Sequence, residues 1–195
     1  FCWSNCFHET SHQTLFGSKK ISVVLGRLLG CFQFLPYSVY RETHTSHHAY
    51  LNTPNDWELW PYSDPTASLR FRRIWVWIDL VFGCITVPYV YSRIYFHKNS
   101  PIKSPALCKT ITLEYMGLFV FWTVTICTVA IFGLWKHLIC GWAIPYFICG
   151  IYHSIRKFSE HLGIDSYDQL LGARTVVGGN PFTRILSFVN FDSFL

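Results

Sequence analysis

Two short clusters contain five of the nine histidines in this sequence of 195 residues. The first reads His8-Glu9-Thr10-Ser11-His12, and the second, after an apolar stretch, reads His44-Thr45-Ser46-His47-His48. Residues three and four positions apart share one face of a helix, so each cluster would project its histidines together if it were helical. Neither a solvated surface nor an apolar core accounts for such a concentration of imidazoles. We therefore predict that the five side chains converge and bind metal.

The first cluster by itself is ambiguous, because His-Glu-x-x-His is also the signature of zinc proteases. In those enzymes two histidines bind zinc and the glutamate, here Glu9, acts as a general base. A peptidase zinc needs three protein ligands and one open position, so it has no use for the three histidines of the second cluster. Five or more imidazoles favour two metal ions instead. Imidazole suits iron, zinc, copper and nickel alike, so the ligand type does not select the metal.

The composition indicates a membrane protein. Hydrophobic residues make up 51% of the chain and charged residues only 14%, whereas soluble domains contain about 25% charged residues. The densest group of positive charge is Arg70, Arg72 and Arg73 at the head of an apolar run, where such residues anchor at lipid headgroups. Nucleic-acid binding is therefore not expected. The chain opens without methionine and closes on apolar residues, so we interpret 1–195 as one domain that lacks its N-terminal and C-terminal parts.

The lengths of the apolar segments predict an all-α, polytopic membrane fold. Segments 74–96 and about 112–135 are long enough to cross a hydrocarbon core that requires about 20 helical residues. The stretch 138–152 has only 15 residues and contains Pro145, so we expect it to be re-entrant or packed in protein. The segment 21–40 is interrupted by Arg27, and we expect a bent or interfacial helix that links the two clusters.

The number of crossings decides whether His161 can join the clusters. If the two long segments cross the membrane and the short one does not, His161 returns to the membrane face that carries the clusters. If all three segments cross, His161 lies on the opposite face. We expect the first arrangement, with the loop 97–110 on the opposite face.

The remaining histidines differ in their surroundings. His97 and His137 flank apolar segments and are expected to lie at the interface without binding metal. His153 could share a helical face with His161, about two turns away, or could be a neutral, hydrogen-bonded histidine at the membrane boundary.

The order of these elements resembles the integral-membrane fatty acid desaturase and hydroxylase superfamily, which also contains alkane monooxygenases and carotenoid-modifying enzymes. The resemblance covers essentially the whole chain and rests on His-x-x-x-His, a hydrophobic connection, His-x-x-His-His, two spans and Glu160-His161-x-Gly163. It implies two iron ions, bound at the cytosolic face of the endoplasmic reticulum or a bacterial inner membrane by His8, His12, His44, His47, His48 and His161. A third box follows the last spans in the family. No histidine follows position 161 here, so the fragment alone is expected to be inactive.

The resemblance also implies a reaction. Iron would activate O2, and hydrogen would be removed from two adjacent methylenes of a lipid acyl chain to form a double bond. Electrons would come from cytochrome b5 or a ferredoxin, and Glu9 and Glu160 would be partners of ligating histidines rather than general bases. One departure from the family pattern is Lys157, which stands where several relatives have an asparagine. Hydroxylation and ketolation use the same boxes, so they remain open, as do an intramembrane zinc protease and a membrane metal carrier.

Overall fold

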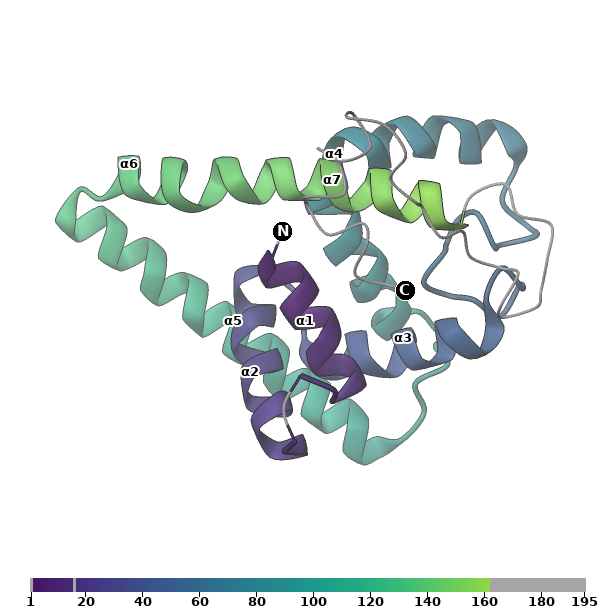
Figure 1. The fold of residues 1–195 in the computed structure, drawn as a ribbon, viewed down its shortest axis with the longest axis horizontal. Helices are drawn as coiled ribbons and strands as arrows, with labels where there is room; N and C mark the ends of the chain where they lie inside the picture. Colours follow the sequence, from purple (N-terminus) through teal and green to yellow (C-terminus); the bar gives the residue numbers. More distant parts are fainter. Residues whose placement is uncertain (1, 16, 162–195) are drawn as a thin grey trace.

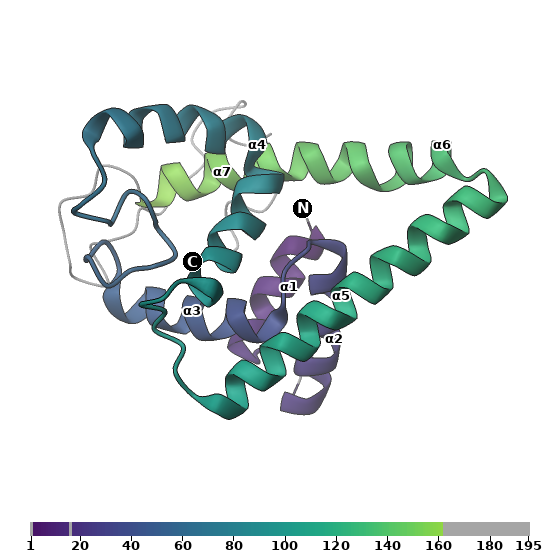
Figure 2. The ribbon, with the colours of Figure 1, turned by 180° about the vertical axis from the view of Figure 1, so that it is seen from behind.

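The computed structural model describes residues 2–15 and 17–161, and the regular structure within them is entirely helical. The helices, in chain order, are α1 (Cys2–His12), α2 (Lys19–Phe32), α3 (Tyr37–Tyr50), α4 (Leu69–Phe96), α5 (Pro105–Phe132), α6 (Trp135–Leu138), a π-helical turn η1 (Ile139–Ala143) and α7 (Ile144–His161). Two long arms, α5 and the continuous run from α6 to α7, meet at one end of the molecule, and α1 and α2 lie between them (Figures 1 and 2).

The two arms hold the end of α2 in place. The last carbonyls of a helix have no partner within the helix, and here side chains of the arms supply one. Trp122 of α5 donates to the Cys31 carbonyl at 2.9 Å, and Trp142 of η1 donates to the Phe32 carbonyl at 3.2 Å. The chain then turns, and α3 leaves at 103° to α2. The predicted bent helix that links the two histidine clusters is thus confirmed.

An ion pair anchors the same bend from the side of α5. Arg27, in the middle of α2, donates to Glu114 of α5 at 2.8 Å. Glu114 also accepts the Ser38 backbone N–H and the Ser38 hydroxyl, each at 2.7 Å. A carboxylate at the N-terminus of α3 satisfies a free N–H and complements the helix dipole. One side chain of α5 therefore fixes where α3, which carries the second cluster, begins.

The expected span 74–96 lies within α4, but α4 does not run straight. It is kinked at Phe82, whose φ of −114° and ψ of 32° are not helical. The rings of Trp75 and Tyr89 are 5.8 Å apart although they are 14 residues apart in sequence, a separation that extends about 21 Å in a straight helix. Both rings also contact Trp60 in the preceding loop. Helix α4 is therefore sharply bent, and Figure 1 shows its two limbs running in different directions.

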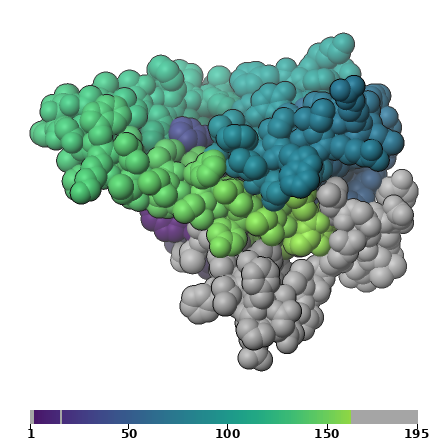
Figure 3. Space-filling view, turned by 90° about the horizontal axis from the view of Figure 1, so that it is seen from above, coloured from purple at the N-terminus to yellow at the C-terminus, as the bar shows by residue number. Residues whose placement is uncertain are grey.

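A proline, a tyrosine and two glycines accommodate this bend. Pro88 cannot donate a hydrogen bond to the Cys84 carbonyl, and the hydroxyl of Tyr146 on α7 donates to that carbonyl instead, at 2.8 Å. Gly83 lies against the backbone of Gly150, and a Cβ on either residue would come closer than 3.0 Å to the facing backbone. Helix α7 consequently lies directly along α4 (Figure 3).

The bend corrects the predicted topology. His97, just after α4, packs against Trp57 with ring centroids 5.3 Å apart, and Trp57 belongs to the loop that follows the second cluster. The prediction that the loop 97–110 faces away from the clusters is therefore wrong. Its basis was length alone, and the turn in the middle of α4 returns the chain to the end from which it started.

The prediction that the stretch 138–152 is too short to cross a membrane is also wrong. This stretch continues in both directions into a helical segment, Trp135–His161, of 27 residues, which is long and apolar enough to cross a membrane. The chain passes Pro145 through the π turn, where the Ile144 N–H bonds to the Ile139 carbonyl five residues back, so the proline does not end the helix. His161 still reaches the clusters, because α5 and Trp135–His161 form an outward and a return pass.

The all-α class and the membrane character are confirmed. Three helices, Leu69–Phe96, Pro105–Phe132 and Trp135–His161, are long and apolar enough to cross a membrane. Large apolar side chains cover the outside of α5; Phe119, for example, is 74% exposed and Ile131 is 76% exposed. Apolar surface of this extent is covered by lipid or by other protein segments in a stable protein.

Candidate metal centre

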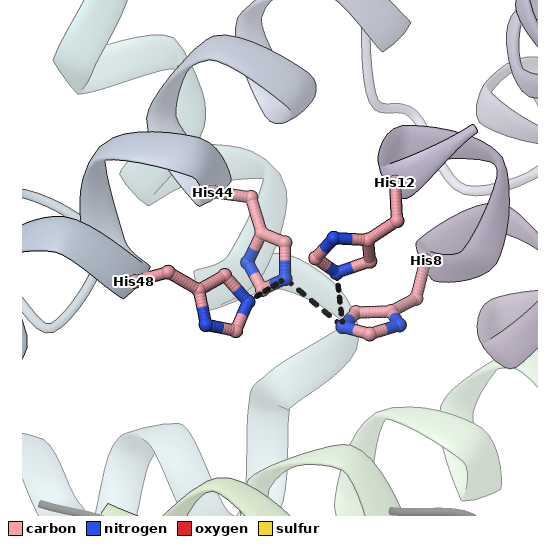
Figure 4. A group of neighbouring side chains, drawn as sticks. All are labelled: His8, His12, His44 and His48. Carbon is pink, nitrogen blue, oxygen red and sulfur yellow. Dashed lines mark hydrogen bonds between the residues drawn. The ribbon is translucent and has the colours of Figure 1, made fainter. Parts of the chain in front are cut away.

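Four histidines from the two clusters form one compact group. His8 and His12 come from successive turns of α1, and His44 and His48 from successive turns of α3 (Figure 4). The Nε2 atom of His8 lies 3.3 Å from that of His12 and 2.9 Å from that of His44, and the Nε2 atoms of His44 and His48 are 3.1 Å apart. One ligand atom from each of the four residues lies within 4.8 Å of all the others. Such a group could hold a metal ion.

Packing brings the two helices to this distance. Phe7 of α1 is buried against Tyr40 of α3 with ring centroids 4.5 Å apart, and Tyr40 stacks on the His44 ring at 5.2 Å. The hydroxyl of Tyr37 donates to the Thr10 carbonyl at 2.7 Å. Gly26 of α2 leaves the space that the Tyr37 ring occupies. Aromatic packing thus brings the two helices together and places the histidines next to one another.

Carboxylates turn two of the four rings toward the group. Glu58 lies 3.1 Å from Nδ1 of His44, and Glu9 lies 3.1 Å from Nδ1 of His8. In each case the other ring nitrogen, Nε2, is left facing the neighbouring histidines. A carboxylate that accepts from one imidazole nitrogen fixes the tautomer and makes the other nitrogen a better metal ligand.

His47 does not join this group. Adjacent residues of a helix point about 100° apart, so His47 turns away from His48 and toward α7, where its ring centroid lies 5.0 Å from that of His161. Its Nδ1 faces Asp56, which is fully buried, at 2.9 Å. The six predicted ligands therefore lie as a group of four and a neighbouring pair, with the His47 ring centroid 5.7 Å from those of His44 and His48. That these side chains bind metal stays a prediction.

Burial and charge set the protonation of these side chains. Burial, together with the neighbouring histidines, lowers the pKa of His8 to about 2 and that of His48 to about 4. Burial also lowers the pKa of His12. These three rings are neutral at pH 7, the form that binds metal.

His47 and Glu58 show the opposite balance. Burial by itself would lower the pKa of His47, but the charge of Glu58 and the hydrogen bond that His47 donates to Asp56 outweigh it and raise the pKa to about 9. Burial would raise the pKa of Glu58, but the charges of His44 and His47 outweigh it and hold that pKa below its usual range. Without metal, His47 therefore favours its protonated form, hydrogen-bonded to Asp56.

The other residues singled out from the sequence lie around this centre. Glu160 is bonded to Arg156 at 2.7 Å and lies 3.9 Å from His161. His153 lines a small cavity of about 40 Å³ behind Phe7 and Tyr40 and is not in the group of four. Lys157 forms an ion pair with the buried Asp79 of α4.

Sequence reasoning missed two carboxylates, Asp56 and Glu58. Both lie in the loop after the second cluster, where no helical period connects them to the histidines. The available signal was the rarity of acidic residues, because the chain has only eleven and three of them, Asp56, Glu58 and Asp64, stand in this aromatic, proline-containing loop. The hydroxyl of Tyr91, on the second limb of α4, also bonds to Glu58.

The donor set fits a transition metal. It consists of imidazoles without a thiolate, and carboxylates support His8 and His44, a combination that suits iron, zinc or copper. His97 and His137 lie apart from it: His97 packs on Trp57, and His137 is exposed on α6.

Comparison with known proteins places the chain. A model of the fatty acid desaturase family matches residues 1–192. No curated protein and no solved structure matches the chain significantly. The match spans both histidine clusters and all of the helices described above. The chain therefore belongs to the fatty acid desaturase family.

Proposed function

We propose that this chain is a membrane fatty acid desaturase that uses O2 and iron, bound by its histidines, to introduce a double bond into an acyl chain. The observation that carries this proposal is the group of four imidazoles whose ligand atoms lie within 4.8 Å of one another, in a chain of the desaturase family. His8, His12, His44 and His48 would hold one iron. His47 and His161 would contribute to a second, together with ligands from outside the described residues.

The side chains have distinct tasks in this proposal. Iron, when bound, supplies the one-electron and oxygen chemistry that amino acids lack. Glu58 and Asp56 hold His44 and His47 by Nδ1, so that Nε2 of each ring is available. Tyr40 and Phe7 keep water from the buried side of the group. The apolar faces of the long helices would accommodate the lipid substrate beside it.

The distribution of charge favours a topology with the centre on the cytosolic side. Because α4 bends back, the basic residues that flank the helices gather at the end that carries the histidines: Arg70, Arg72, Arg73, Lys98, Lys103, Lys109, Arg156 and Lys157. At the far end, where α5 meets α6, Lys136 of α6 is the one Lys or Arg among the described residues. An excess of Lys and Arg marks the cytoplasmic side of a membrane protein. Cytochrome b5 or a ferredoxin would then deliver electrons from this side.

The zinc protease alternative receives little support from the geometry. A protease glutamate must reach a water bound to the metal. Here one carboxylate oxygen of Glu9 contacts Nδ1 of His8, while Nε2 of His8 faces the group of four. The other oxygen of Glu9 accepts from the Thr14 hydroxyl at 3.0 Å. The carboxylate thus lies behind the ring, where it can orient the ligand and cannot activate a water in front of it.

The test is product formation by the complete protein in membranes, supplied with O2, a reducing system and a mixture of acyl lipids. We expect unsaturated products from the wild type, none from His44→Ala, and wild-type amounts from the control His137→Ala. A hydroxylated product without a double bond would refute desaturation in favour of the related oxygenase reaction. Equal products from all three proteins would refute the role of the histidine group.

A further inference from the structure

A second site lies on the other side of Asp56 from the histidines. It is a cavity of about 300 Å³ between the loop that follows the second cluster and the loop that follows α4. Arg93, from the last turn of α4, enters it, and Trp57, Trp60, Asp64, His97 and Asn99 contribute to its lining. Nothing in the proposed function uses this cavity.

The arginine is held in place by aromatic rings. Its guanidinium carbon lies 4.2 Å from the centroid of the Trp60 ring and 5.6 Å from that of Trp57. Stacking of this kind orients a guanidinium without using its N–H groups. Among residues 2–15 and 17–161, no carboxylate lies within 4.0 Å of the Arg93 nitrogens, and its buried Nη1 has no hydrogen-bond acceptor.

His97 adds a second donor. The Asn99 backbone N–H donates to Nδ1 of His97 at 3.1 Å. A neutral imidazole that accepts at Nδ1 carries its proton on Nε2. Nε2 of His97 is therefore a donor, and within the described part of the chain no acceptor is bonded to it.

The two carboxylates that line the cavity already accept several hydrogen bonds. Asp64 accepts from the Thr66 hydroxyl at 2.7 Å, from the Thr66 backbone at 2.9 Å and from Trp60 Nε1 at 3.2 Å. Asp56 accepts from His47. The unused hydrogen-bonding groups of the cavity are thus mainly donors, one of them on a permanent cation, so the matching ligand is an oxyanion.

We propose that this cavity binds a phosphate group. Several oxygens on one phosphorus can accept from both the guanidinium fork and the imidazole. The cavity exceeds the size of a single phosphate, so it can also take part of the group attached to it, with the tryptophan faces as apolar contacts. The phosphate can belong to a lipid headgroup or to a soluble molecule, and the experiment separates these sources. The negative charge of Asp64 opposes binding and provides a lever for the test.

The test measures binding of radiolabelled orthophosphate to the complete protein by equilibrium dialysis in phosphate-free dodecyl maltoside. We expect one site in the wild type. Arg93→Gln should weaken binding at least about tenfold, because it removes charge-assisted hydrogen bonds. Asp64→Asn, which removes the opposing charge, should tighten it. The control Arg73→Gln removes the same charge from an exposed position of α4 and should leave binding unchanged.

The source of the phosphate follows from lipid phosphorus measured on the same samples after extensive detergent washing. About one phospholipid retained by the wild type and lost in Arg93→Gln identifies a lipid headgroup, whereas orthophosphate binding without retained lipid identifies a soluble phosphate. The proposal is overturned if the wild type binds neither. It is also overturned if Asp64→Asn fails to tighten binding, a result that does not depend on whether Arg93→Gln folds. Metal content is a separate measurement, so failure here leaves the proposed function intact.

Discussion

Replacement of Asp56 by asparagine is the most informative change near the histidines, because Asp56 is fully buried and does not belong to either histidine motif. Its Oδ1 accepts from His47 at 3.0 Å and from the Leu59 backbone at 3.3 Å. Its Oδ2 accepts from His47 at 2.9 Å and from the Asn52 backbone at 3.1 Å. An asparagine side chain replaces one of the two carboxylate oxygens with an NH2 group, which can only donate. In either orientation this NH2 group faces a backbone N–H, of Leu59 or of Asn52. Asp56→Asn therefore keeps the shape of the side chain and breaks the pattern of bonds.

The magnitude follows from these four contacts. A buried donor left unsatisfied costs about 1–3 kcal/mol of folding free energy, and the bond to His47 also loses its charge assistance. Loss of a carboxylate behind a ligating histidine lowers metal affinity about 10- to 100-fold. We expect Asp56→Asn to unfold at a lower temperature than the wild type and to lose metal at chelator concentrations that the wild type withstands.

The assay is a chelator titration of the purified complete protein, with metal content read by mass spectrometry, alongside a thermal melt. Glu42→Gln is the matched control, since Glu42 is an exposed carboxylate of the same helix, α3. If Asp56→Asn and Glu42→Gln retain metal equally and melt together, Asp56 does not position His47, and the division of the ligands into two groups has no support.

Three further predictions concern the fold that presents the site. Gly83→Ala should destabilise the protein by about 1–3 kcal/mol, because the new Cβ meets the Gly150 backbone. The control Gly117→Ala, in open space on α5, should be neutral or stabilising. Equal melting temperatures of the two variants would show that α4 and α7 do not cross closely. Tyr146→Phe removes the hydroxyl that bonds to the Cys84 and Gln33 carbonyls and should cost about 1–2 kcal/mol, so an unchanged denaturant midpoint would contradict its role at the bend. In a cysteine-depleted background, cysteines at Ser46 and Asn99 should label from one side of the membrane and a cysteine at Leu134 from the other, and labelling of Asn99 together with Leu134 would mean that α4 crosses.

The histidine groups could be predicted because a helix repeats its faces over short distances. His8 with His12 and His44 with His48 are each four residues apart, and both pairs lie together. The same helical geometry turns His47 away from the other four histidines. That it then lies beside His161 depends on the position of α7, which the sequence pattern does not give. Asp56 and Glu58 could not be placed, since a loop has no period and their partners are set by the packing of α3 against α4.

The topology shows where counting apolar residues fails. Segment 74–96 had the length of a span, and its Pro88 and Gly83 were the signs of a bend that depends on contacts with Tyr146 and Gly150 of α7. Segment 138–152 has only 15 residues and contains Pro145, so its length predicted no crossing. A single π turn accommodates that proline, and such a turn leaves no mark in composition.

Metal content tests the central claim, that the two histidine clusters form an iron centre, most directly. The complete wild-type protein and His12→Ala would be purified without added metal, and iron and zinc would be measured per chain. We expect close to two iron ions per wild-type chain and a clear loss of iron from His12→Ala. Zinc in place of iron, or the same iron content in both proteins, would contradict this claim.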